Sequence, residues 1–262
     1  MTRYLKLFFT FFRNCFMREM EFRFNLFTWT VMNFVYLLFV LLGTNLVFGQ
    51  TSSIAGWPKS EVLLLVYTTA LFNDLMWTFL MKNLDNFSDL VRNGKLDGVL
   101  LKPVSTRFMV SARYFEFDHY LRIPLLAWLI VHQANILNPG IGITNWIGFS
   151  LGIVSSLVIF SNFYFMVTTT NIWFISIFNL DQFFDEISTI TRYPVGMFKK
   201  SIRLVLIYLI PTIFIAYIPV NILLGRHNLT SLIWSLGAGI LLSYLSQKFW
   251  RFALKHYSSA SS

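Results

Sequence analysis

The sequence predicts an all-α polytopic membrane protein, and three observations support this fold class. Six long apolar runs follow one another along the 262 residues: 27–48, 62–80, 123–143, 146–178, 204–224 and 229–247. They are long enough to cross a hydrocarbon core, which takes roughly 20 apolar residues per helix. The composition agrees, because 56% of the residues are hydrophobic and 13% are charged, whereas a soluble chain carries about 25% charged residues. The Lys and Arg residues lie between the runs, and Asp74 is the one charged residue inside them.

Residues 3–24 form an amphipathic segment ahead of the first run. Tyr4, Phe8, Phe12 and Phe16 recur at helical spacing, and most basic residues lie off this stripe or at its edge. The pattern predicts a helix in the inner membrane interface; the alternative is an extension of the first span into water. No small-residue cleavage site follows a short apolar region, so 27–48 is read as a retained span rather than a signal peptide.

The placement of basic residues predicts the orientation. Five basic residues precede the first span, loop 50–61 holds one, loop 82–116 holds six, loop 138–145 holds none and three follow the last apolar run. Basic residues collect on the cytosolic side, so both termini are predicted to be cytosolic. The same rule accounts for the net charge of +9 without a nucleic-acid partner.

Residues 146–224 allow two topologies that both keep the C-terminus inside. In the first, 181–203 is a cytosolic loop and 204–224 is the fifth span. In the second, 172–194 is a polar fifth span and 204–224, broken by Pro211 and Pro219, is a re-entrant hairpin on the outer side. Proline at such depth is tolerated where neighbouring protein satisfies the backbone. The count of basic residues favours the first topology.

Acidic residues within spans are candidates for function. Asp74 lies about two turns from the inner end of the second span. It is read either as a contact for a cation, proton or substrate or, in preference, as part of a structural salt bridge or hydrogen bond to a neighbouring helix. Asp181, Asp185 and Glu186 lie within a span in the second topology and in a solvated loop in the first.

Motifs of catalysis and metal binding are absent from the sequence. Gly94-Lys95 has neither the preceding glycine nor the following Ser or Thr of a phosphate-binding loop, and the four histidines and Cys15 are scattered. The sequence therefore predicts no ATPase activity, no metal and no cofactor in this chain.

The inner loop 82–116 carries the most distinctive motif. Gly94, Leu96, Asp97, Leu100, Leu101, Pro103 and Val104 match the pattern G-x-L-D-x-x-L-L-x-P-V, and a second stretch runs from Arg192-Tyr193-Pro194 through Pro211 and Pro219 to Gly225. In these motifs and its span layout the chain resembles the membrane subunits of ABC exporters. Within them, it is most similar to the type-2 permease class and its subgroup of six-span permeases of about this length.

The resemblance implies a single transmembrane domain over 1–262 with six spans: 27–48, 62–80, 118–137, 146–168, 172–194 and 229–249. It favours the second topology, with 204–224 re-entrant and 3–24 as the interfacial helix. It implies a bacterial cytoplasmic-membrane exporter in which two permeases, identical or related, form a translocation path at their interface. A separate soluble ATPase would bind ATP and Mg²⁺ and contact loop 82–116. The coupling residues that it implies are Asp89, Arg92, Gly94, Lys95, Leu96, Asp97, Leu100, Leu101 and Pro103.

Three other functions remain open on the residues alone. A membrane-embedded transferase would need a constellation of carboxylate, histidine or metal near the interface, for which Asp181, Asp185 and Glu186 are the only candidates and lack a partner set. The other two are not enzymes. One is a membrane scaffold subunit without a translocation path, which would have no ATPase partner. The other is an ATP-independent secondary transporter, which would more often show inverted repeats, and no such symmetry is seen in the sequence. Lipids of the surrounding membrane are expected partners in each case.

Overall fold

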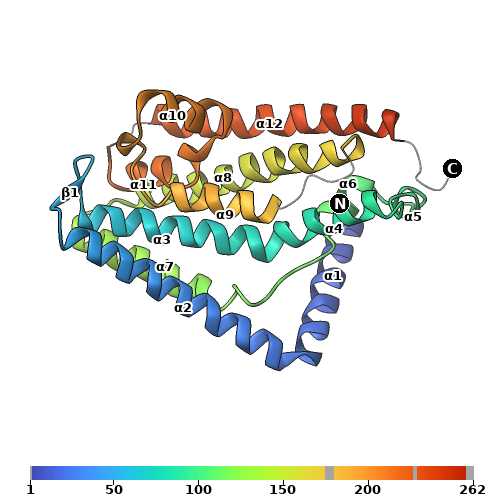
Figure 1. Cartoon of the computed structure of the whole chain (residues 1–262), viewed down its shortest axis with the longest axis horizontal. Helices are drawn as coiled ribbons and strands as arrows, with labels where there is room; N and C mark the ends of the chain where they lie inside the picture. The colour runs from blue at the N-terminus through green and yellow to red at the C-terminus, as the bar shows by residue number, and fades with distance from the viewer. Residues whose placement is uncertain (1, 175–179, 227–228, 258–262) are drawn as a thin grey trace.

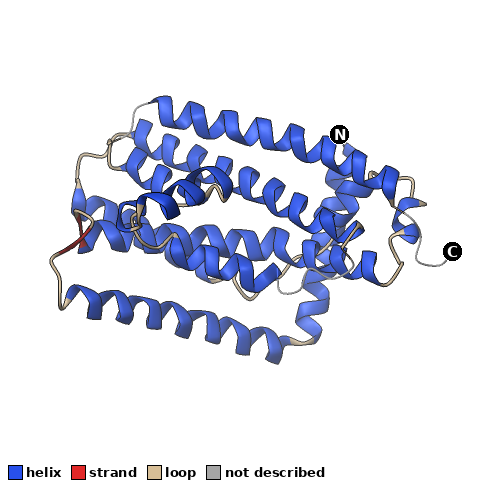
Figure 2. Cartoon of the chain, turned by 45° about the horizontal axis from the view of Figure 1, so that its top comes forward, coloured by secondary structure: helices blue, strands red, loops and turns tan. Residues whose placement is uncertain are grey.

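The computed structural model describes residues 2–174, 180–226 and 229–257, which form a bundle of helices along one axis (Figure 1). The chain termini lie at one end of this bundle. A short antiparallel hairpin of strands β1 (Ser53–Ile54) and β2 (Trp57–Pro58) lies at the opposite end (Figures 1 and 2). These two ends are called here the terminal end and the hairpin end.

The helices differ widely in length. The longer ones are α1 (Thr2–Glu21), α2 (Arg23–Phe48), α3 (Lys59–Met76), α4 (Lys82–Arg92), α7 (Arg122–Leu137), α8 (Ile143–Thr169), α9 (Leu180–Ile190) and α12 (Leu229–His256). The short ones are α5 (Asp97–Leu100), α6 (Thr106–Ser111), α10 (Lys200–Leu204) and α11 (Tyr217–Leu223). Single π or 3₁₀ turns complete the set: η1 (Trp77–Met81), η2 (Thr170–Ile172), η3 (Val195–Met197), η4 (Val205–Leu209) and η5 (Thr212–Phe214).

The centre of the bundle is one continuous helix of 34 residues, Lys59–Arg92, made of α3, η1 and α4. Leu64, Phe72, Met76 and Phe87 along it are fully buried. The π turn η1 lies where this helix leaves the predicted span and enters the predicted loop. Loop 82–116 is therefore largely helical in the structure, being built from α4, α5 and α6.

Helix α2 differs from the buried central helix, because its apolar surface is exposed. Phe24 and Leu46 are 81% and 74% exposed, which suits contact with lipid or with another apolar chain. Phe22 interrupts the helix between α1 and α2 with φ −105° and ψ 40°, so α1 turns away from α2 and crosses the terminal end (Figure 1).

The aromatic stripe of α1 packs against protein. The rings of Phe8 and Phe12 meet that of Phe115 edge-on at 5.1 and 5.3 Å, and Phe16 meets Phe117 at 5.4 Å. Other apolar side chains of α1, such as Phe9 at 65% exposed, remain free to contact lipid. The amphipathic pattern thus marks a helix that is covered on one side by the segment before α7.

Small residues bring α8 close to its neighbours. A Cβ at Gly148 would lie 2.7 Å from the Ile222 side chain, and one at Gly152 would lie 3.3 Å from Pro219. Toward α12, the hydroxyls of Ser155 and Ser235 share a hydrogen bond of 2.9 Å. Small side chains and interhelical hydrogen bonds are the means by which membrane helices associate, because lipid provides no hydrophobic drive between them.

The segment before α12 is bent and lies at the hairpin end. Lys200–Leu209 and Thr212–Leu223 meet at 77°, at Pro211, which cannot donate a helical hydrogen bond. The Arg226 guanidinium donates to Glu61 at 2.7 Å, the ring of Tyr217 lies 5.6 Å from that of Trp57, and a Cβ at Gly196 would lie 3.4 Å from Ala55. Residues 196–226 therefore border the strand hairpin, away from both termini (Figure 1).

Within the described residues, three helices are long and apolar enough to cross a membrane: Arg23–Phe48, Lys59–Arg92 and Ile143–Ile172, with the bent pair as a fourth candidate. The all-α class is confirmed, whereas six spans remain a prediction. The predicted third span, 118–137, is helical from Arg122, because turns precede it, and α7 has 16 residues. The predicted fifth span, 172–194, includes residues outside the described ones, and its described helix is α9, with 11 residues.

Candidate functional site

A cavity of about 910 Å³ opens between α2, α3, α9 and the segment from Glu116 to Arg122. This volume is within the range of small-molecule sites. Its apolar and aromatic lining comes from Phe22, Leu26, Trp29, Met32, Tyr36, Trp77 and Phe117. Its polar lining comes from Arg18, Glu19, Asn25, Asn33, Asn73, Lys82, Glu116, Asp118, His119, Arg122, Asp185, Ser188 and Arg192.

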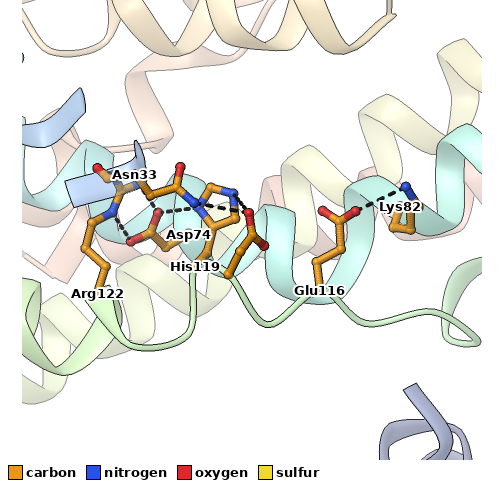
Figure 3. Close-up of polar contacts among 7 residues, drawn as sticks. Asn33, Asp74, Lys82, Glu116, His119 and Arg122 are labelled. Atoms are coloured by element: carbon orange, nitrogen blue, oxygen red, sulfur yellow. Dashed lines mark hydrogen bonds and ion pairs between the residues drawn. The ribbon is translucent and has the colours of Figure 1, made fainter. Parts of the chain in front are cut away.

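The polar floor of the cavity rests on a buried ion pair. The Asp74 carboxylate is fully buried, and Arg122 Nε donates to its Oδ2 at 2.8 Å while Arg122 Nη2 donates to Oδ1 (Figure 3). The two-point contact uses the planar fork of the guanidinium. Arg122 also donates to the backbone oxygen of Asn33. The pair thereby joins α2, α3 and the first residue of α7.

His119 lies between two carboxylates beside this pair. Its Nδ1 is 3.0 Å from Asp74 Oδ1, and its Nε2 is 3.6 Å from Asp118 Oδ2. The Trp77 ring stacks on the imidazole at a centroid distance of 6.0 Å. Asp118 also accepts from the Asn33 side-chain amide at 3.1 Å. The cavity floor is therefore one connected polar network.

A second ion pair lies further along the central helix. Lys82 Nζ and Glu116 Oε1 are 3.2 Å apart, next to the network in Figure 3. Burial raises the pKa of the Glu116 carboxyl, and the adjacent Lys82 ammonium opposes that rise.

Helix α9 brings further charged residues to the cavity. Arg192, which follows α9, donates to the Tyr36 hydroxyl at 2.6 Å and lies over the Tyr36 ring at 5.2 Å. Asp185 lines the cavity, and Glu186 is exposed beside it. Asp181 belongs to the first turn of α9, and its side chain lies outside the described ones.

The predicted coupling residues lie within residues 89–103, called here the coupling segment, at the terminal end. Helix α4 ends where Lys95 N–H donates to Leu90 O at 2.8 Å and Gly94 N–H donates to Val91 O at 3.2 Å. These two bonds are the Schellman pattern, which places its C′ residue in the left-handed region. Gly94 occupies that position with φ +63°. On the last turn of α4, Arg92 pairs with Asp89 at 2.7 Å on an exposed surface.

Helix α5 follows with one face inward and one outward. Leu96 is fully buried and Val99 nearly so, whereas Leu101 is 87% exposed. Lys95, Leu100, Lys102 and Pro103 are exposed as well. Leu100 and Leu101 thus place two consecutive apolar side chains on the surface of this segment.

Both ends of the chain reach this segment. Arg3 donates to the Pro103 backbone oxygen at 3.0 Å, and Tyr4 accepts from Ser105 N–H at 3.3 Å. At the other terminus, burial and the neighbouring Asp97 carboxylate raise the pKa of the Tyr257 phenol. Movement of the coupling segment would therefore change the contacts that it makes with α1 and with the residue that follows α12.

Comparison with known families decides the class of the protein. The family model described as ABC-2 family transporter protein matches residues 34–261. The chain belongs to this family. Searches of curated proteins and of solved structures found no significant match. The protein is thus a multi-pass transmembrane permease, the membrane subunit of an ABC transporter, and its family implies association with an ABC ATPase.

The site of this permease was partly predictable. The role preferred for Asp74 was a structural salt bridge or hydrogen bond to a neighbouring helix. In the structure its ion-pair partner is Arg122. No pattern in the sequence groups Asn33, Glu116, Asp118 and His119 with Asp74, because those residues are far from it along the chain. One signal was present: a carboxylate inside a span requires a nearby cation, and Arg122 is the basic residue that adjoins the next apolar run.

The described part of this permease offers no group of three or more His, Cys, Asp and Glu residues suited to a metal ion. Membrane subunits of the family are typically not catalytic. Charged and apolar side chains both line the cavity.

Proposed function

We propose that this permease is the membrane subunit of an ATP-driven exporter with both termini in the cytosol of a bacterial cell. A soluble ATPase would bind beneath the terminal end, and two permeases would pair around the translocation path. The observation that carries this proposal is the coupling segment, whose buried Leu96 and Val99 hold Leu101 out into solvent.

The proposed topology is the one with a re-entrant hairpin. Residues 196–226 border the strand hairpin of loop 50–61. This loop holds a single basic residue, so the positive-inside rule assigns it to the outer side. The 77° bend at Pro211 suits a segment that enters and leaves on one side. The alternative, in which 181–203 is a cytosolic loop, would put Gly196 and Ala55 on opposite faces of the membrane although they are neighbours.

Coupling would work by shifting the population of permease conformers. ATP would close the ATPase pair, and its contact with α5 would favour one arrangement of the segment over another. A partner shifts such an equilibrium only by its differential affinity for the two states. The ties from Arg3 to Pro103 and from Tyr257 to Asp97 provide routes by which α1 and α12 would respond.

The cavity is proposed as the inner part of the translocation path. It is bordered by α2, α3 and α9, which correspond to the first, second and fifth predicted spans, and α2 leaves a large apolar surface exposed. A second permease covering that surface would close the cavity into a path between the two chains.

Co-purification tests the proposal. The permease is isolated in mild detergent from cells that express it, and the proteins recovered with it are identified by mass spectrometry. Recovery of a soluble ABC ATPase is expected, and Leu101→Asn should reduce it by about tenfold, the loss for one apolar anchor at a contact. Leu121→Asn is the matched control, because Leu121 is also exposed, at 62%, but lies outside the coupling segment. Recovery of the chain alone, with no stimulation of added ATPases, would overturn the proposal.

A further inference from the structure

Arg107 is a cation at the terminal end that is held by neutral groups. Its Nη1 donates to Gln247 Oε1 at 2.6 Å, and its Nη2 donates to Asn162 Oδ1 at 2.7 Å and to Ser246 Oγ at 2.8 Å. The guanidinium also lies 4.7 Å from the centre of the Phe165 ring. Among the described residues no Asp or Glu forms an ion pair with it.

This arrangement leaves a positive charge without a counter-ion. Two other basic residues of the inner loop, Lys82 and Arg92, pair with the acidic residues Glu116 and Asp89. Burial lowers the pKa of Arg107, which means that the surroundings penalise its charged form. Removing a charge from water is costly unless an opposite charge compensates it, so an anion beside Arg107 would be stabilised.

A pocket with the right chemistry adjoins Arg107. It has a volume of about 370 Å³ and lies between η1–α4, α6 and α8. Its polar lining consists of Ser105, Ser111, Ser161, Asn162 and Arg107, and no acidic residue lines its described walls. Its apolar lining includes Leu80, Leu84 and Phe165. A single positive charge, the hydroxyl donors of Ser105 and Ser111 and an apolar wall fit an anion that is attached to a hydrocarbon group.

We propose that this pocket binds the phosphate group of an anionic phospholipid from the membrane leaflet at the terminal end. Arg pairs with phosphate through its fork of N–H donors, and basic pockets between membrane helices on the cytosolic side are suited to lipid headgroups. The glycerol and first acyl carbons would lie against Leu80 and Leu84. A choline or ethanolamine group would find no carboxylate in the pocket, so anionic lipids are favoured over zwitterionic ones.

The proposal is separate from substrate transport. The pocket shares no lining residue with the larger cavity. Only the assignment to the cytosolic leaflet rests on the proposed topology. The ligand could also be a soluble phosphate ester, and the experiment must distinguish the two sources.

Lipid retention in native mass spectrometry tests the proposal. The full-length permease, with any partner that co-purifies, is stripped of lipid in detergent and titrated with phosphatidylglycerol, phosphatidylcholine or diacylglycerol. Phosphatidylglycerol should bind about tenfold more tightly than the other two, as expected for one charge-assisted contact. Arg107→Gln should remove that preference. Arg251→Gln is the matched control, because Arg251 is an exposed arginine near the same end of α12.

A second variant protects the test against misfolding. Arg107→Gln also removes the hydrogen bonds to α8 and α12 and could unfold the chain. Ser111→Leu fills the pocket and leaves those bonds in place, so it should lose phosphatidylglycerol while keeping the unfolding temperature of the parent. Equal binding of the three lipids, or undiminished phosphatidylglycerol binding in Ser111→Leu, would overturn the site. Displacement of phosphatidylglycerol by an equal concentration of glycerol 3-phosphate would overturn the lipid assignment. None of these readouts depends on transport or on an ATPase.

Discussion

The carboxylate of Asp74 and the guanidinium of Arg122 form a two-point ion pair that is buried between α3 and the first turn of α7. The two residues are separated by the whole of the inner loop in the sequence, yet they are direct partners in the core. Their pairing fixes where α7 begins, because Arg122 is both its first residue and the partner of Asp74. It also orders the segment that carries Glu116, Asp118 and His119 along the cavity.

Breaking this pair should destabilise the permease. Asp74→Asn leaves a buried guanidinium without a counter-charge, and loss of one partner of a buried pair costs about 3–5 kcal/mol. The unfolding temperature in detergent should fall markedly, as measured by loss of the monodisperse peak on heating. The double variant Asp74→Leu with Arg122→Met should recover much of that loss, because neither charge remains buried. If Asp74→Asn unfolds at the parent temperature, the pair does not stabilise the fold.

The fold class was predictable, whereas the partners of Asp74 were not. Apolar runs and basic loops depend on composition over about 20 residues, so they can be read without knowing any contact. The network around Asp74 depends on the fold of Glu116–Arg122, a stretch that has no periodic pattern. Loop 82–116 shows the same limit, since Gly94 marked a break but nothing in the sequence placed Arg3 or Tyr257 beside the coupling segment.

For residues 172–224, charge counting and the packing of the helices favour different topologies. Lys199, Lys200 and Arg203 favoured a cytosolic loop, but the structure brings this segment to the end with the strand hairpin. Two of these three basic residues, Arg203 and Lys200, have a role in the local structure of this segment. Arg203 donates to the backbone oxygens of Gly196 and Phe198 at 3.0 and 3.2 Å, and Lys200 begins α10. A rule based on counting treats such residues as free charges.

Glu116 should make stability depend on pH. Its pKa is raised in the folded protein, chiefly by burial, so the folded state holds the proton more tightly than the unfolded state does. The resulting stabilisation is complete below the unfolded pKa of about 4.3 and is lost as the pH rises through the folded pKa. Glu116→Gln should therefore show a smaller fall of the unfolding temperature between about pH 4 and pH 7. The exposed Glu21→Gln is the control, and an identical pH profile for Glu116→Gln and the parent would refute the prediction.

Gly94 should be needed for the shape of the coupling segment. An L-residue at φ +63° carries a steric cost of roughly 1–2 kcal/mol, so Gly94→Ala should weaken the turn that joins α4 to α5. The expected result is faster amide hydrogen exchange over residues 93–103 and, under the proposed function, weaker stimulation of the ATPase. Gly98→Ala is the matched control, because a Cβ at Gly98 meets nothing within 4 Å. If the two variants exchange alike, the left-handed turn at Gly94 is dispensable.

Gly148 should be the least replaceable glycine of α8. A Cβ there would lie 2.7 Å from Ile222 Cγ2, which is closer than side-chain atoms pack, so Gly148→Ala must push α11 away from α8. Overpacking of this kind costs about 1–3 kcal/mol and should lower the unfolding temperature. Gly237→Ala, where a Cβ meets nothing within 4 Å, should leave it unchanged or raise it slightly. Adding Ile222→Ala to Gly148→Ala removes the clashing methyl group and should restore part of the loss. If that rescue fails, Gly148 is required for its backbone conformation rather than for the close approach of α11 to α8.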